Sequence, residues 1–128
     1  MSYYFSNKVK GSFEKTRERV ISSLKEEGFG ILTEIDVKET LKKKMDVDFR
    51  KYKILGACNP PFAYQALQAE DKIGTMLPCN VIVQEIAPEE IEVAAVDPVS
   101  SMKAVENPKL SEVARQVQEK LKRVIEGL

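Results

Sequence analysis

The sequence contains no histidine and no tryptophan, and only two of its 128 residues are cysteine. Without histidine, the chain has no Ser-His-Asp triad, no Cys-His pair and no histidine metal site. Two cysteines are too few for the disulfide framework of a small secreted domain. No apolar run approaches the roughly 20 residues of a membrane-spanning helix, and the first residues lack a signal-peptide pattern. These absences predict a cytoplasmic protein with reduced thiols that does not engage a membrane.

The charge of the chain is balanced. Lysine plus arginine number 20, as do aspartate plus glutamate, so the formal net charge is zero. A nucleic-acid partner is not expected, because such proteins carry a basic surface. Zero net charge does not oppose the association of two copies. Apolar residues make up 43% of the chain, which is enough for a core, and the length predicts one domain over residues 1–128.

Five segments have the β-branched and aromatic composition of strands, at residues 2–9, 29–36, 52–58, 79–86 and 91–96. In the second of these, alternation predicts that Ile31, Thr33 and Ile35 share one face. The last two segments are separated by a short turn and predict an antiparallel hairpin. The strands have mixed rather than uniformly apolar faces, which favours an antiparallel sheet with helices on one side.

Two long amphipathic helices are predicted, one from Phe13 to just before Gly28 and one after Asn107. Ser12 and the Asn-Pro pairs at Asn59 and Asn107 read as helix N-caps. Residues 37–45 and 60–70 predict shorter helices, residues 71–78 a loop, and residues 98–105 a helical turn. The chain is therefore expected to form a two-layer α+β fold of order β-α-β-β-β-β-α with short extra helices.

The most distinctive segments are Gly-Ala-Cys-Asn-Pro-Pro at residues 56–61 and Pro-Cys-Asn at residues 78–80. Cys58 ends one predicted strand and Cys79 begins the next, so both thiols are expected at one edge of the sheet. The candidate ligand-binding residues are Cys58, Asn59, Cys79, Asn80 and Asp97, because thiols, amides and a carboxylate can face a bound group. The ordinary interpretation is that the cysteines are buried, the asparagines cap turns and helices, and Asp97-Pro98 is a turn.

Two further uses of the cysteines are considered. A metal site is not expected, because structural zinc takes four ligands and this region offers two sulfurs. A disulfide between Cys58 and Cys79 requires α-carbons closer than about 7 Å.

Residues 28–67, the LPCNVIVQE segment and the AVDP segment resemble the domain of unknown function 302 family. The positions that match its motifs are Cys58, Asn59, Pro60, Pro78, Cys79, Asn80, Asp97 and Pro98. The resemblance implies a fold like that of the TATA-binding-protein class, with a curved antiparallel sheet and helices on one face, and it implies a homodimer. It implies no reaction.

The sequence thus predicts a dimeric module that binds or senses a small molecule near the two Cys-Asn motifs. It does not identify the ligand, and it specifies no cofactor. Two alternatives stay open: a thiol-dependent redox enzyme and a purely structural dimerisation module. An enzyme is not favoured, because a nucleophilic thiol needs an adjacent base or cation and neither cysteine is flanked by lysine or arginine.

Overall fold

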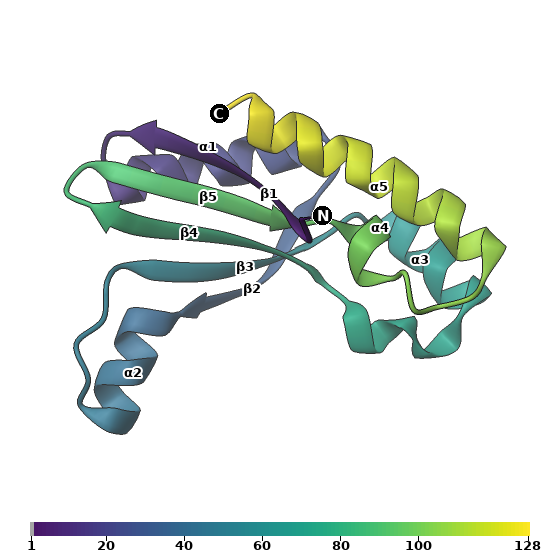
Figure 1. Ribbon diagram of the computed structural model, residues 1–128, viewed down its shortest axis with the longest axis horizontal. Helices are drawn as coiled ribbons and strands as arrows, with labels where there is room; N and C mark the ends of the chain where they lie inside the picture. Colours follow the sequence, from purple (N-terminus) through teal and green to yellow (C-terminus); the bar gives the residue numbers. More distant parts are fainter. Residues whose placement is uncertain (1) are drawn as a thin grey trace.

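The computed structural model describes residues 2–128, which form a five-stranded antiparallel sheet with helices (Figure 1). The strands are β1 (Tyr4–Lys10), β2 (Gly30–Asp36), β3 (Tyr52–Cys58), β4 (Cys79–Ala87) and β5 (Glu90–Val96). The helices are α1 (Phe13–Glu26), α2 (Val37–Met45), α3 (Pro60–Ala69), the 3-10 helix η1 (Asp71–Met76), α4 (Pro98–Ser101) and α5 (Pro108–Glu126). The predicted α+β class and element order are confirmed.

The strands lie in the order β1-β5-β4-β3-β2, and all neighbours are antiparallel. The predicted hairpin is β4 and β5, joined by a tight turn in which Glu89 has a φ of 61°. The first strand of the chain pairs with the last, which places β4 in the centre of the sheet. The central position of β4 matters for the site, because Cys79 is its first residue.

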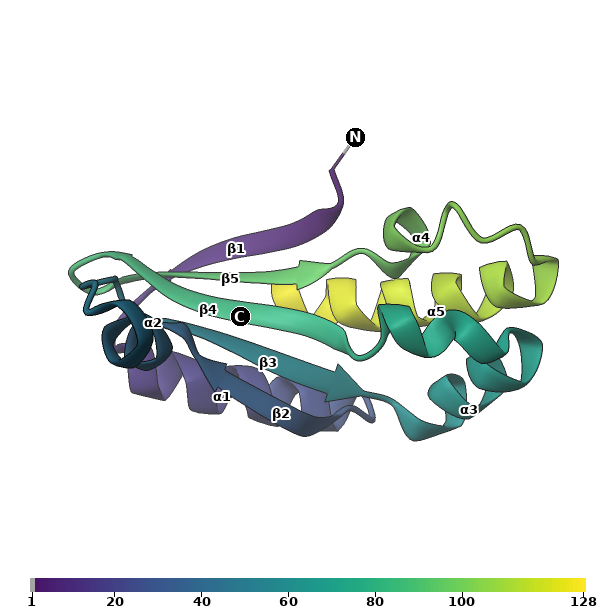
Figure 2. The same cartoon turned by 90° about the horizontal axis from the view of Figure 1, so that it is seen from below.

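The two long helices cover one face of the sheet, and the view in Figure 2 shows them behind the strands. Alternate residues of β3, β4 and β5 point toward these helices and are at most 1% exposed: Leu55, Ala57, Val81, Val83, Ile91, Val93 and Ala95. The helices contribute buried stripes that include Val20 and Leu24 of α1 and Leu121 of α5. Burial of these side chains is the main stabilising contribution, at roughly 1.5–3 kcal/mol for each large one.

The face predicted for strand β2 is wrong at one residue. A bulge at Leu32 shifts the register, so that Ile31 pairs with Ala57 while Thr33 pairs with Gly56. Ile31 therefore lies on the helix-covered side and contacts the core, whereas Ile35 pairs with Ile54 on the other face and is 48% exposed. The extra residue of a bulge reverses the alternation beyond it, and strict alternation does not predict this.

The helix ends agree with the local signals, except at Asn59. The Ser12 hydroxyl accepts a hydrogen bond from the Lys15 amide at 3.1 Å, and Gly28 stops α1 in a left-handed conformation with a φ of 90°. Asn107 caps α5 by accepting from the Lys109 amide at 3.1 Å. Asn59 holds the N-cap position of α3, but its side chain makes no capping hydrogen bond.

Four helical elements extend beyond one end of the sheet: α3, η1, α4 and the first turns of α5 (Figures 1 and 2). Asn107 also donates from its Nδ2 to the Ala69 carbonyl at 2.8 Å, which joins the start of α5 to the end of α3. Among the helices of residues 2–128, none combines the length and the apolar character that crossing a membrane requires. The helical extension and the ends of β3 and β4 enclose the candidate site.

Candidate functional site

The two cysteines lie on neighbouring antiparallel strands at the same end of the sheet. Cys79 is the register partner of Ala57, so Cys58 follows one position further along β3. Both thiols are free; Cys79 is buried and Cys58 is half-buried. The sequence predicted that the two motifs meet at one sheet edge, and the topology brings them together there.

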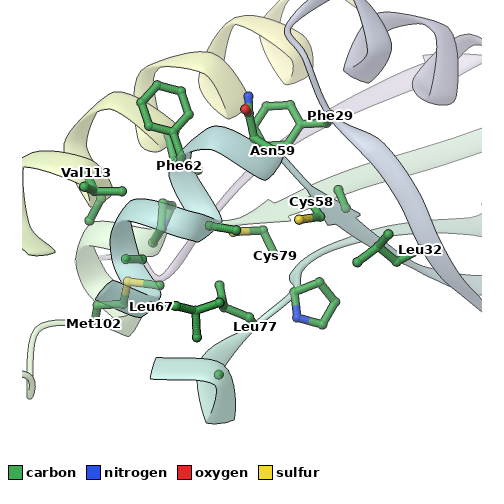
Figure 3. A pocket seen from close by; sticks show the side chains of 18 residues that line it. Phe29, Leu32, Cys58, Asn59, Phe62, Leu67, Leu77, Cys79, Met102 and Val113 are labelled. Atoms are coloured by element: carbon green, nitrogen blue, oxygen red, sulfur yellow. The ribbon is translucent and has the colours of Figure 1, made fainter. Parts of the chain in front are cut away.

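Both cysteines line a cavity of about 350 Å³ between the strand ends and the helical extension (Figure 3). The wall is almost entirely apolar, and among residues 2–128 the only amide or charged side chain that lines it is that of Asn59. The lining comes from β2 and the segment after α1 (Phe29, Leu32), β3 and α3 (Ala57, Cys58, Asn59, Phe62, Ala63, Ala66, Leu67), η1 and β4 (Gly74, Leu77, Pro78, Cys79), and α4 and α5 (Pro98, Met102, Val113, Ala114, Val117).

The cavity exists because small side chains face one another where larger ones would fill the space. Ala57 of β3, Ala66 of α3 and Ala114 of α5 are each at most 4% exposed, and all three line it. Protein interiors are normally packed as densely as organic crystals, so unfilled volume of this size is uncommon within a core. The space is open to a molecule larger than water.

The mouth of the cavity carries exposed apolar side chains. Leu32, at the β2 bulge, is 67% exposed, and Leu67 of α3 is 43% exposed. Helix α3 (PPFAYQALQA) contains no charged residue, and its Tyr64 is also exposed. An uncharged helix with apolar residues on its solvent side is the sequence signal that could have identified this wall, and sequence reasoning missed Phe62, Leu67 and Met102 as lining residues.

Asn59 lines the cavity, but its amide is used in the structure. Its Nδ2 donates to the Glu27 carbonyl at 3.1 Å, which ties the end of α1 to the start of α3. Gly28 leaves room for this contact, since a Cβ there would lie 3.0 Å from Nδ2. Figure 3 shows the amide turned away from the two sulfur atoms. The N-cap role predicted for Asn59 is therefore replaced by a bond between two helices.

The other two candidate residues lie away from the cavity wall. Asn80 follows Cys79 on β4 and points to the opposite, uncovered face of the sheet, where it is exposed and pairs in register with Gly56. The Asp97 carboxylate caps α4, accepting from the Val99 amide at 3.0 Å, and also accepts from Gln118 at 3.0 Å. The structure thus brings Cys58, Asn59 and Cys79 together, and leaves Asn80 and Asp97 outside.

The electrostatics of the cavity favour neutral groups. Burial, together with the neighbouring Cys58, raises the pKa of Cys79 to about 11, because an apolar surrounding disfavours the charged thiolate. Cys79 is therefore a protonated thiol at neutral pH. Across residues 2–128, no three histidine, cysteine, aspartate or glutamate side chains are grouped so that they could hold a metal ion.

Two of three comparisons with known proteins gave a match. A family model described as "Domain of unknown function DUF302" matches residues 5–128. Among solved structures, the chain is similar to an uncharacterized conserved protein DUF302 from Bacillus stearothermophilus, with a TM-score of 0.90 and 28% sequence identity over 98% of each chain. The search of curated proteins gave no match. The likeness to the TATA-binding-protein class stays a prediction.

Proposed function

The chain belongs to the DUF302 family, and we propose that it is a binding module whose cavity takes a small, neutral, apolar molecule. The observation that carries the proposal is the cavity of about 350 Å³, whose wall is apolar apart from Asn59 and the two thiols. Ligand sites are typically concave, mostly apolar and roughly 300–1,000 Å³ in volume.

The chemistry of the wall supports a neutral ligand. A charged group in this cavity would lose its hydration, and the wall carries no charged side chain to compensate it. The one amide of the wall, that of Asn59, already donates to Glu27. An apolar molecule gains roughly 25 cal/mol for each Å² of surface removed from water. Binding therefore rests on burial and shape rather than on ion pairing.

The exposed residues at the mouth support entry on the side of α3. Leu32 and Leu67 extend the apolar surface from the cavity into solvent. Such a continuous path allows an apolar molecule to enter without crossing a polar barrier.

A neutral fluorescent dye, N-phenyl-1-naphthylamine, tests the proposal. The natural protein is expected to raise the fluorescence of the dye and to bind it saturably. Ala66→Leu fills the cavity and should weaken binding about tenfold or more, a loss of about 1.4 kcal/mol. The matched control is Ala104→Leu, which adds the same side chain at an exposed position outside the cavity and should leave binding unchanged.

Circular dichroism and thermal unfolding establish that both variants are folded. If Ala66→Leu is unfolded, Ala63→Leu on the same helix takes its place. Absence of saturable dye binding, or equal binding by the natural protein and a folded cavity-filled variant, would contradict the proposal. Native mass spectrometry of the purified protein gives the identity of any retained molecule.

The proposal includes a homodimer that forms through the uncovered face of the sheet. Ile35, Ile54, Ile82 and Ala94 stand in one register row across four strands of this face. Lys8 and Glu92 are direct cross-strand partners in a neighbouring row. In a dimer with a twofold axis, the apolar rows of the two copies would pack against each other. Lys8 of each copy would then lie near Glu92 of the other.

The alternatives are less well supported. A thiol-dependent enzyme needs an activated thiolate, whereas burial keeps Cys79 protonated through its raised pKa. A purely structural dimerisation module would gain stability if its cavity were filled, because unfilled core volume is destabilising. The binding module accounts for both the cavity and its apolar mouth.

A further inference from the structure

The positions of Cys58 and Cys79 meet the backbone requirement for a disulfide. Because Cys79 pairs with Ala57, the two cysteines are offset by one strand spacing and one residue, which puts their α-carbons about 6 Å apart. Disulfide-bonded cysteines have α-carbons roughly 4.4–6.8 Å apart. The distance limit that the sequence left open is therefore satisfied.

The side chains also border one cavity. Neighbouring positions on paired strands point to opposite faces of a sheet, and at the strand ends both of these positions adjoin the cavity. Both line the same cavity, and Figure 3 shows both sulfur atoms within the ring of lining side chains. Cys58 is half-buried and reachable from solvent, whereas Cys79 lies deeper.

We propose that Cys58 and Cys79 form a reversible dithiol–disulfide pair that hydrogen peroxide oxidises, with Cys58 as the attacking thiol and Cys79 as the resolving thiol. This inference does not depend on occupancy of the cavity by a ligand. The disulfide fastens together the two ends of residues 59–78, the segment that contains α3 and η1 and forms one wall of the cavity.

The chemistry proceeds in two steps. The Cys58 thiolate sulfur attacks one peroxide oxygen, the O–O bond breaks, and the second oxygen leaves as hydroxide that takes up a proton to become water. Cys58 is then a sulfenic acid. The Cys79 sulfur attacks the Cys58 sulfur, the S–O bond breaks, and the departing hydroxide takes the Cys79 proton to leave as a second water. Two thiols are oxidised by two electrons, peroxide is reduced to two waters, and a dithiol reductant reverses the change.

Intact-mass spectrometry of the full chain after brief peroxide treatment tests the assignment. The natural protein should lose the mass of two hydrogen atoms, remain a single chain on a non-reducing gel, and recover its mass with dithiothreitol. Cys79→Ser should instead gain one oxygen atom at Cys58, which dimedone traps. Cys58→Ser is the matched control, and its Cys79 should react at least about tenfold more slowly, because the raised pKa leaves little thiolate.

Disulfide-linked dimers in place of the intramolecular product, or no loss of mass in the natural protein, would overturn the pair. Equal reaction rates of Cys58→Ser and Cys79→Ser would overturn the assigned order. Dye binding is measured separately on the reduced protein, so failure of the disulfide and failure of the cavity ligand are distinguishable.

Discussion

At the scale of single residues, the site depends on close contacts that few side chains allow. Gly28 has a positive φ and lies against the Asn59 side chain. Asn59 makes no capping hydrogen bond to α3 and instead donates to the Glu27 carbonyl. Gly56 of β3 lies close to Thr33 of the neighbouring strand β2 and to Pro78, which directly precedes β4. Pro78 and Cys79 line the cavity. The absence of a side chain at Gly28 and Gly56 therefore sets how closely the segments around the cavity pack against one another.

Gly56→Ala is expected to destabilise the protein by about 1–3 kcal/mol, as overpacking of a filled site does. The added Cβ would collide with the Thr33 hydroxyl and would lie 2.8 Å from Cγ of Pro78. Urea unfolding followed by circular dichroism measures the change in the free energy of unfolding.

Gly30→Ala is the matched control for this prediction, because a Cβ at Gly30 meets nothing within 4 Å. Its free energy of unfolding should stay the same or rise by less than about 1 kcal/mol, since alanine restricts the unfolded chain. Equal destabilisation by the two substitutions would show that crowding at Gly56 is not the cause.

At the scale of elements, hydrogen bonds between helices hold the cavity wall. The Glu27 carbonyl accepts from Asn59 of α3, and the Glu27 carboxylate pairs with Arg123 of α5 at 3.0 Å. Arg123 thereby holds the pKa of Glu27 below its usual value. One residue at the end of α1 therefore joins three helices, and Asn107 joins α3 to α5 at their other ends. Contacts between helix ends therefore hold the wall together, and strand pairing does not.

Asp97→Ala is expected to lower stability by about 1 kcal/mol, because it removes the cap of α4. It also removes the acceptor for Gln118. Asp97 does not line the cavity, so the affinity of the folded variant for the naphthylamine dye should not change. Urea unfolding and a dye titration of the same preparation make the two measurements.

Asp97→Asn keeps a side-chain oxygen at the cap and should retain most of the stability, since asparagine caps helices as well as aspartate does. Loss of dye binding in folded Asp97→Ala would contradict this prediction and would support the ligand-binding role that the sequence predicted for Asp97.

At the scale of the whole molecule, the two faces of the sheet differ. One face of the sheet packs against α1 and α5 and holds the core. The other face is turned toward the viewer in Figure 2. Tyr4, next to the apolar row on this second face, is 42% exposed and Ile35 is 48% exposed. An apolar surface of this kind commonly marks an interface, and the proposed dimer would cover it.

Ile82→Glu is expected to shift the protein from dimer to monomer, because it places a charge in the centre of the proposed interface, where desolvation is costly. Sedimentation equilibrium at several concentrations measures the change. Val99→Glu on α4 is the control, since Val99 is 40% exposed and α4 lies beyond one end of the sheet. A natural protein that stays monomeric at every concentration, or a dimer unaffected by Ile82→Glu, would refute the interface.

The sequence by itself determined the elements and their order. Caps at Ser12 and Asn107, the left-handed Gly28 and the apolar stripe of α5 act within a few residues of themselves, so they can be recognised without the fold. The adjacency of Cys58 and Cys79 was also predictable, because each motif stands at the end of a strand. Tertiary structure alone decided the bulge at Leu32, the partner of Asn59, the position of Asn80 on the opposite face and the cavity beneath α3. Each of these depends on which distant segments pack against one another, and no local pattern carries that information.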